Sequence, residues 1–195
     1  MLSVVLFCED AGHAAVIRSL IERIGSEIDI KIDLAVKNST GGHGQAINSL
    51  KNYVKDIAKE REYRPDILIV AIDANCHGFQ ERRKEILRIV EEVGIEPVCA
   101  VPDPHVEKWL LLDSAAFKTV FGKGCALPTY KCEKDKYKRL LIEAIIESGI
   151  IPTLGGIEFA ADIIEATNLE RASGQDGSFE QFCTDLRSTF KLRSQ

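Results

Sequence analysis

No apolar run in this chain of 195 residues approaches the roughly 20 residues that a helix needs to cross a bilayer. The amino-terminal stretch carries no basic residue before it turns acidic at Glu9, which is too early for a secretory signal peptide. Neither an internal repeat nor a low-complexity tract is present. These absences predict a globular protein that resides in the cytoplasm and does not associate with a membrane.

The six cysteines form no Cys-x-x-Cys pair. Cys125 and Cys132 are the closest two, and they lack the second pair of ligands that a zinc site requires. Cys8 and Cys99 lie inside apolar runs, where thiols are usually buried. The spacing therefore argues against a zinc site and predicts reduced thiols with structural roles.

Acidic residues outnumber basic residues, and the formal net charge is -5. This argues against a protein that coats nucleic acid through electrostatics alone. It is compatible with a nuclease, because acidic metal ligands lower the net charge while a bound cation restores a local positive potential. The densest basic stretch, residues 131–139, is interleaved with acids, so we interpret it as a solvated helix face in preference to a nucleic-acid groove.

Four apolar runs bounded by polar turns predict four strands, at residues 4–8, 29–36, 66–73 and 97–101. The segments between them carry apolar residues at helical spacing, at residues 14–24, 47–57 and 79–93. Repetition of strand and helix in this way predicts parallel strands joined by right-handed crossovers. We therefore expect a Rossmann-like α/β fold with a central, mostly parallel four-stranded sheet.

The rest of the chain shows helical patterns only, at residues 106–120, 135–148, 156–166 and 179–190. The phenylalanines of the last pattern recur at helical spacing and are interpreted as core residues. The length of the chain suits one domain. We expect residues 1–125 to form an α/β core and residues 126–195 to form a helical extension packed on that core.

Two of the expected strands end in polar side chains that are candidates for a metal site. Glu9 follows the first strand, and Asp73 and Asn75 follow the third. The carboxyl ends of parallel strands form the ligand-binding edge of an open α/β sheet, so we expect Glu9 and Asp73 to meet there. Oxygen ligands of this kind hold Mg²⁺. The alternatives are a solvated Glu9 beside a helix-capping Asp10, and an Asx turn at Asp73 or Asn75.

Two further segments contain candidates for chemistry at the same edge. Glu107 lies in the first turn of the helix expected after the fourth strand, where it could be a third acid or merely interact with the helix dipole. Gly41, Gly42 and Gly44 precede the second helix, where backbone amides could cradle a phosphate. A plain turn is the alternative, because the lysine and hydroxyl residue of a Walker A motif are absent.

All four histidines fall in the segments that follow the four expected strands: His13, His43, His77 and His105. This placement suggests that they line one cleft with Glu9 and Asp73. Half-polar residues favour such loops in any case, however, and we do not interpret the histidines as ligands.

The chain resembles the topoisomerase–primase (Toprim) superfamily, and in particular the small stand-alone Toprim-like proteins related to the overcoming-lysogenization-defect (OLD) nucleases. The resemblance lies in the order and spacing of three segments: Cys8-Glu9-Asp10, Asp73-Ala74-Asn75 and Glu107-Lys108-Trp109-Leu110-Leu111-Leu112-Asp113. It implies a Toprim fold that cleaves phosphodiesters with Mg²⁺ or Mn²⁺, in which Glu9 is the acid/base and Asp73 a metal ligand. These families have a second aspartate where this chain has Asn75.

Two hypotheses of different classes follow. The first is a metal-dependent nuclease for DNA or RNA, which the resemblance implies could be the nuclease subunit of an ATPase-coupled defence against phage. The second is a catalytically degenerate Toprim-like module that binds an AAA- or ABC-type ATPase, and Asn75 and the net acidity favour it. A phospho-receiver is a weaker third hypothesis, because no lysine ends a fifth strand. Self-association is compatible with each. We expect Glu9 and Asp73 to be exposed, so that their loss removes activity and leaves folding intact.

Overall fold

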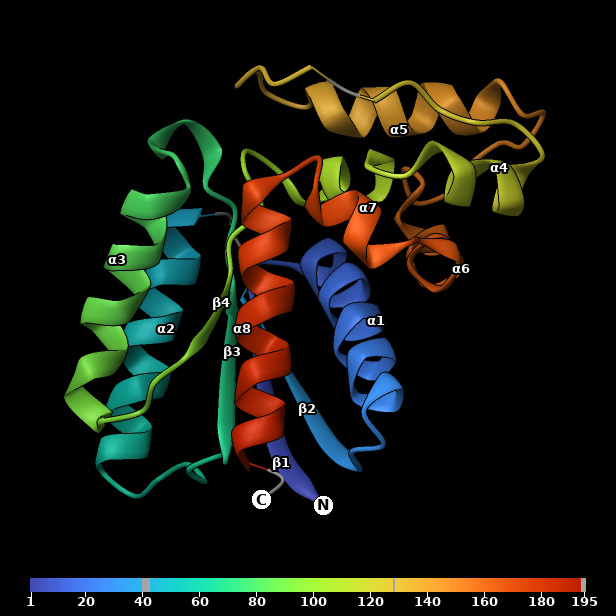
Figure 1. The fold of residues 1–195 in the computed structure, drawn as a ribbon. Coiled ribbons are helices and arrows are strands. Elements are labelled where there is room, and N and C mark those ends of the chain that lie inside the picture. The colour runs from blue at the N-terminus through green and yellow to red at the C-terminus, as the bar shows by residue number, and fades with distance from the viewer. Residues whose placement is uncertain (40–42, 128, 194–195) are drawn as a thin grey trace.

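The computed structural model describes residues 1–39, 43–127 and 129–193. Within them, four strands form one parallel sheet in the order β2-β1-β3-β4 (Figure 1). The strands are β1 (Leu2–Cys8), β2 (Ile32–Asn38), β3 (Ile67–Ala71) and β4 (Val98–Ala100). The predicted Rossmann-like α/β class with a parallel four-stranded sheet is confirmed.

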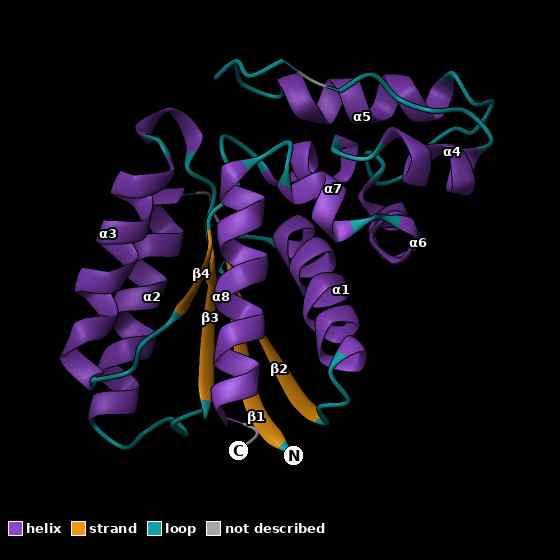
Figure 2. Ribbon diagram, viewed as in Figure 1, coloured by secondary structure: helices purple, strands orange, loops and turns teal. Residues whose placement is uncertain are grey.

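Helices cover both faces of this sheet (Figure 2). One face packs against α2 (His43–Ala58) and α3 (Phe79–Val90), and the other packs against α1 (Ala11–Glu27) and α8 (Gly177–Arg193). Successive residues of a strand alternate between the two faces, so Val5 and Phe7 contact one layer and Val4 and Leu6 the other. Burial on both faces explains why the central strands are continuously apolar.

The start of one expected strand and the continuity of one expected helix are wrong. Helix α1 continues to Glu27, and Asp29 adopts a left-handed conformation (φ 54°) in the following turn, so the strand expected from residue 29 begins at Ile32. The helix expected at residues 106–120 is divided into a 3₁₀ helix, η3 (Val106–Leu111), and α4 (Ser114–Phe121). The division falls at Asp113, whose carboxylate caps α4 by accepting from two of its backbone N–H groups.

The carboxyl-terminal part of the chain shares its core with the sheet. It contains α5 (Lys136–Ile146), η4 (Ile157–Phe159), α6 (Ala160–Ala166), α7 (Leu169–Ser173) and α8. Apolar residues of these helices join the cluster that also buries Val4 and Leu6. Trp109 lies at its centre and contacts Phe179 edge-on and Phe182 face-on, with ring centroids 5.2 and 5.6 Å apart. The division at residue 125 stays a prediction.

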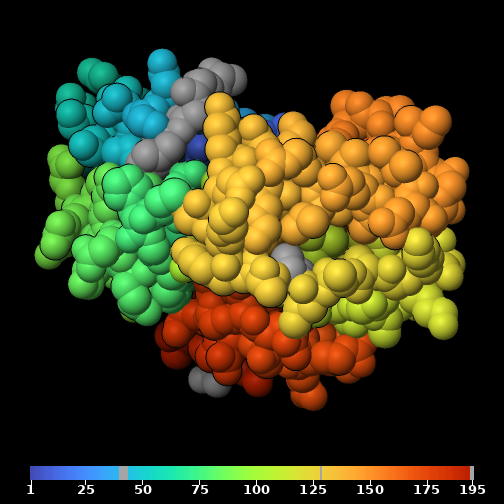
Figure 3. All heavy atoms as spheres, turned by 90° about the horizontal axis from the view of Figure 1, so that it is seen from above, coloured from blue at the N-terminus to red at the C-terminus, as the bar shows by residue number. Residues whose placement is uncertain are grey.

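In Figure 1, α5 and the segment that precedes it lie beyond the carboxyl ends of the strands, and they occupy much of the face seen from that end (Figure 3). Two short elements complete the chain, η1 (Asn75–His77) after β3 and η2 (Glu91–Val93) after α3. Among the described residues, no helix combines the length and the apolar character that crossing a bilayer requires.

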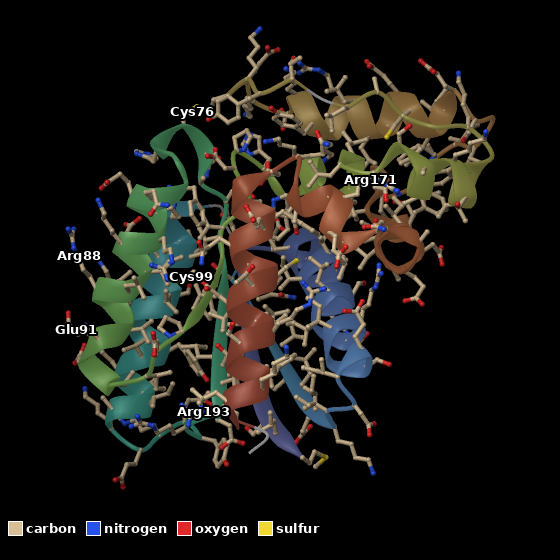
Figure 4. All side chains as sticks on the ribbon, viewed as in Figure 1. Cys76, Arg88, Glu91, Cys99, Arg171 and Arg193 are labelled. Carbon is tan, nitrogen blue, oxygen red and sulfur yellow. A yellow bond between two sulfur atoms is a disulfide. The ribbon has the colours of Figure 1, made fainter. Side chains whose placement is uncertain are left out.

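A disulfide joins Cys76 of η1 to Cys132, with the two Cα atoms 5.6 Å apart (Figure 4). The expectation of reduced thiols is therefore wrong for these two cysteines and right for the other four: Cys8, Cys99, Cys125 and Cys183. The paired cysteines are 56 positions apart and belong to no motif, and only the fold brings them together. Because disulfides are uncommon in cytosolic proteins, location in the cytoplasm stays a prediction.

Truncation of the central tryptophan tests this description of the core. Trp109 is 1% exposed, and we expect Trp109→Ala to lower the free energy of unfolding by about 3–5 kcal/mol, because the cavity cannot fully collapse. Tyr63, which is 71% exposed, supplies the control, and Tyr63→Ala should change stability by less than about 0.5 kcal/mol. Urea unfolding followed by circular dichroism measures both. Equal effects of the two substitutions would contradict the proposed centre of the core.

Candidate functional site

The strand order singles out the carboxyl ends of β1 and β3. The chain leaves β1 toward β2 on one side and returns to β3 on the other, so the carboxyl ends of β1 and β3 are the point where the order reverses. Ligands of open α/β sheets bind at such a point. Glu9 directly follows β1, and its backbone N–H donates to Ala71 O at the end of β3 (2.9 Å). The structure thus brings Glu9 and Asp73 to the same edge.

Asp73 is the centre of this edge, and it is buried: the residue is only 8% exposed, so the expectation that it is exposed is wrong. Its two carboxylate oxygens contact two different histidines. His13 Nε2 lies 2.9 Å from Oδ1, and His105 Nδ1 lies 3.1 Å from Oδ2. Arg82 Nε also donates to the backbone carbonyl of Asp73 (3.1 Å). A buried carboxylate requires partners of this kind.

His13 links Asp73 to a second carboxylate. It lies in the first turn of α1 and is 2% exposed. Its Nδ1 contacts Asp10 Oδ1 (2.9 Å), and its backbone N–H donates to the same oxygen (3.0 Å), which makes Asp10 the amino-terminal cap of α1. Both ring nitrogens of His13 are therefore engaged by carboxylates.

His105 differs from His13 because it is only half-buried. It follows β4, and its loop is tied to the β3 loop by the backbone N–H of Asn75, which donates to Pro104 O (3.0 Å). With Nδ1 on Asp73, no hydrogen bond from within the described residues reaches Nε2. Its ring lies beside that of Tyr137, with centroids 6.2 Å apart. His105 therefore presents one oriented ring nitrogen that is available to a ligand.

Charges alternate along this chain of contacts. Burial lowers the pKa of His13, but the carboxylates of Asp73 and Asp10 outweigh it, and the pKa lies well above its ordinary value. Burial raises the pKa of Asp73, yet His13 and His105 bring it below its ordinary value. The hydrogen bond from His13 lowers the pKa of Asp10 to about 2. The hydrogen bond to Asp73 raises the pKa of His105. At neutral pH a cationic His13 thus lies between two carboxylates.

Two glutamates flank Asp73. Burial raises the pKa of Glu9, and the charge of Asp73 raises it further. Burial likewise raises the pKa of Glu107, which lies in the first turn of η3. Within the part of the chain that the structure describes, Glu9 Oε2 is buried without a hydrogen-bond partner, and a cation would give this oxygen a contact. Glu9 therefore fits a metal ligand.

The other candidates lie elsewhere. Asn75 has positive φ (50°), and its Nδ2 donates to the backbone carbonyl of Asp73, two residues earlier (3.4 Å). Gly41 and Gly42 fall outside the described residues. Gly44 lies in the first turn of α2, where a Cβ would meet no described atom within 4 Å, so packing against the described residues does not require a glycine there. Within the described residues, no three His, Cys, Asp or Glu side chains are arranged to hold a metal ion.

Sequence reasoning did not assign roles to His13 and His105, although it noted that both follow expected strands. That placement was the available signal. The family resemblance could not supply the roles, since none of the three segments on which it rests contains His13 or His105. No protein-family model, curated protein or solved structure matches the chain. A function for this protein therefore has to be inferred from the geometry and charges of the site.

Removal of the central charge should destabilise the protein. We expect Asp73→Asn to lower the free energy of unfolding by about 3–5 kcal/mol, because it leaves the buried cation of His13 with a broken pair. Asp33→Asn, on the exposed side of β2, is the control and should change stability by less than about 0.5 kcal/mol. Chemical denaturation of both variants measures the difference. A stability of Asp73→Asn equal to wild type would show that Asp73 is not held by charged partners.

The raised pKa of His13 predicts the sign of a pH effect. A raised folded pKa contributes stability that is complete below the unfolded pKa of about 6.5 and is lost as pH rises through the folded pKa. The difference in unfolding free energy between wild type and His13→Gln should therefore be largest in mild acid and shrink in alkali. Urea titrations at several pH values measure it, and NMR of the imidazole nitrogens locates the titration directly. A difference that grows with pH would refute a cationic His13.

Proposed function

We propose that the carboxyl edge of β1 and β3 is the active site of a hydrolase that cleaves phosphodiester bonds, and more specifically of a metal-dependent nuclease acting on DNA or RNA. The observation that carries this proposal is the pairing of Asp73 with His105, which holds the His105 ring at the edge of the sheet where Glu9 and Glu107 also interact electrostatically with Asp73. Hydrolysis of a phosphodiester needs an acid, a base and a means of stabilising negative charge.

His105 is suited to the proton transfers. Asp73 at Nδ1 fixes the orientation of the ring, so Nε2 either accepts a proton from the attacking water or donates one to the leaving oxygen. The raised pKa of His105 increases its protonated fraction near neutral pH, which favours the role of acid. Glu9, whose pKa is also raised, is then the candidate for the base.

His13 contributes a buried positive charge next to Asp73. It is enclosed, and both ring nitrogens are committed to carboxylates, so it does not exchange protons with a substrate. Its charge offsets that of Asp73 and makes the approach of an anionic phosphate less unfavourable. Its role is therefore electrostatic and positional.

A divalent cation, Mg²⁺ or Mn²⁺, fits beside Glu9. The unpartnered Oε2 of Glu9 is the strongest indication, and Glu107 is the second carboxylate that would hold the ion. When bound, such an ion stabilises negative charge on the phosphate and lowers the pKa of bound water. We assign Asp73 to orienting the histidines, because both of its oxygens already have ring nitrogens as partners. The amide oxygen of Asn75 is the candidate for a neutral ligand of the same ion.

A specific observation also favours the second candidate function, a catalytically silent module that binds an AAA- or ABC-type ATPase. Asp73 is occupied by histidines, and the described residues contain no group of three metal-binding side chains. Asn75 cannot supply the second negative charge that a metal pair would use. The cytoplasmic location, self-association and defence against phage belong to the proposal in the same way and await experiment.

Cleavage assays test the proposal. Plasmid DNA and single-stranded RNA are incubated with wild type, His105→Gln and Glu9→Gln in Mg²⁺ and in Mn²⁺. We expect each substitution to reduce the cleavage rate by about 100-fold or more, because each removes a proton-transfer group. His77→Gln, an exposed histidine at the same edge, is the control and should cleave as wild type does.

Each outcome of this assay has a clear meaning. Full activity of His105→Gln would refute the assignment of the acid, and full activity of Glu9→Gln would refute the assignment of the metal ligand and base. No cleavage by wild type in either metal would favour the silent module. Circular dichroism of every variant is needed to separate loss of chemistry from loss of folding.

A further inference from the structure

We propose that residues 129–139 bind the substrate strand, and that this strand is single-stranded nucleic acid. We call these residues the basic segment. The identity of the ligand rests on the proposed nuclease function, but the experiment measures binding alone, so the two can fail separately. The sequence favoured a solvated helix face for this stretch, and its position in the fold is what changes the interpretation.

The basic segment is fixed at the proposed active site by three contacts. The disulfide joins Cys132 to Cys76, three positions after Asp73. Tyr130 OH donates to Asp103 Oδ1 (3.2 Å), in the loop that leads to His105. The buried ring of Tyr137 packs beside His105 itself. In Figure 3 this gold part of the chain lies on the face seen from the carboxyl ends of the strands. A strand bound here lies beside the proposed active site.

The basic segment is positive in an otherwise acidic protein. It holds five basic and two acidic side chains, a net charge of +3 in a chain whose net charge is -5. Lys131, Lys134, Lys138 and Arg139 are exposed. Glu133 pairs with Lys131 and Arg139, and exposed ion pairs of this kind are weak, so a phosphate can compete for the two cations. Elsewhere the excess of acids repels nucleic acid, so its attraction is directed to this segment.

Tyr130 supplies an exposed aromatic ring within the same segment. It is 58% exposed, although its hydroxyl is held by Asp103 and Lys108 Nζ lies 5.3 Å from its ring centroid. The ring is thus fixed at its hydroxyl end and largely accessible. A base stacks on such a ring only when it is free of its partner strand. Cations that contact phosphates beside one stacking ring are characteristic of single-strand binding.

Binding is measured by fluorescence anisotropy, in EDTA and without reductant, with labelled DNA and RNA strands of about 12 nucleotides. The triple variant K131E/K134E/K138E tests the charges. We expect it to lower the slope of log affinity against log salt by about 2, at about 0.7 per lost phosphate contact. The control K51E/K55E/K59E changes the net charge equally on α2 and the residue after it, and should preserve the slope.

Tyr130→Ala tests the ring. We expect it to weaken binding about 5- to 150-fold, the usual range for one stacked base, whereas Tyr130→Phe keeps the ring and should bind nearly as wild type does. Equal losses in the two triple variants would overturn the proposal, as would tighter binding of duplex than of single strands, or no binding by wild type. Comparison of DNA with RNA identifies the preferred strand.

The results also separate this inference from the proposed function. If the basic segment binds as expected and no variant or wild type cleaves, the inference stands and the nuclease proposal fails. If wild type cleaves and K131E/K134E/K138E binds normally, the inference alone fails.

Discussion

The organisation of this protein depends on one buried charge, the carboxylate of Asp73. A carboxylate removed from water is costly unless it is paired and hydrogen-bonded, and here each oxygen has its own histidine while the backbone carbonyl accepts from Arg82. These partners come from different parts of the chain: His13 from α1, Arg82 from α3 and His105 from the loop after β4. The hydrogen bonds and ion pairs of this one carboxylate therefore connect the segments that follow β1, β3 and β4 at the carboxyl edge of the sheet.

A second buried polar cluster shows what a purely structural network looks like in the same molecule. Lys108 Nζ contacts Asp176 (2.5 Å) and the carbonyl of Asp103 (2.9 Å), while Ser178 accepts from the indole N–H of Trp109 (3.2 Å). Its charges are paired within the protein, and it joins η3 to the start of α8. The cluster around Asp73 differs because, among the described residues, Glu9 Oε2 and His105 Nε2 have no hydrogen-bond partner. That difference, more than the presence of acids, separates a candidate active site from a structural ion pair.

The sequence was informative wherever local chemistry determined the outcome. Doubly buried strands have to be apolar, so β1 and β3 were recognisable, and a carboxylate that ends such a run has to emerge at the carboxyl edge, as Glu9 and Asp73 do. It was uninformative wherever distant segments meet. The histidine partners of Asp73 lie 60 and 32 positions away, and the disulfide joins cysteines 56 positions apart. Asp113 combines both cases: its cap of α4 is local, whereas its ion pair with Arg171 of α7 joins positions 58 apart.

The position of α8 has a consequence for how the chain acquires its structure during synthesis. This last of the described helices covers the side of the sheet that α1 shares, and Phe179, Phe182 and Phe190 fill the core there. While the ribosome adds residues at about 5–20 per second, every strand is complete long before these phenylalanines exist. During this interval the apolar residues that α8 later covers are exposed to water and to other nascent chains. For that interval, protection by a chaperone or a delay in sheet closure matters more to the yield of protein than its final stability does.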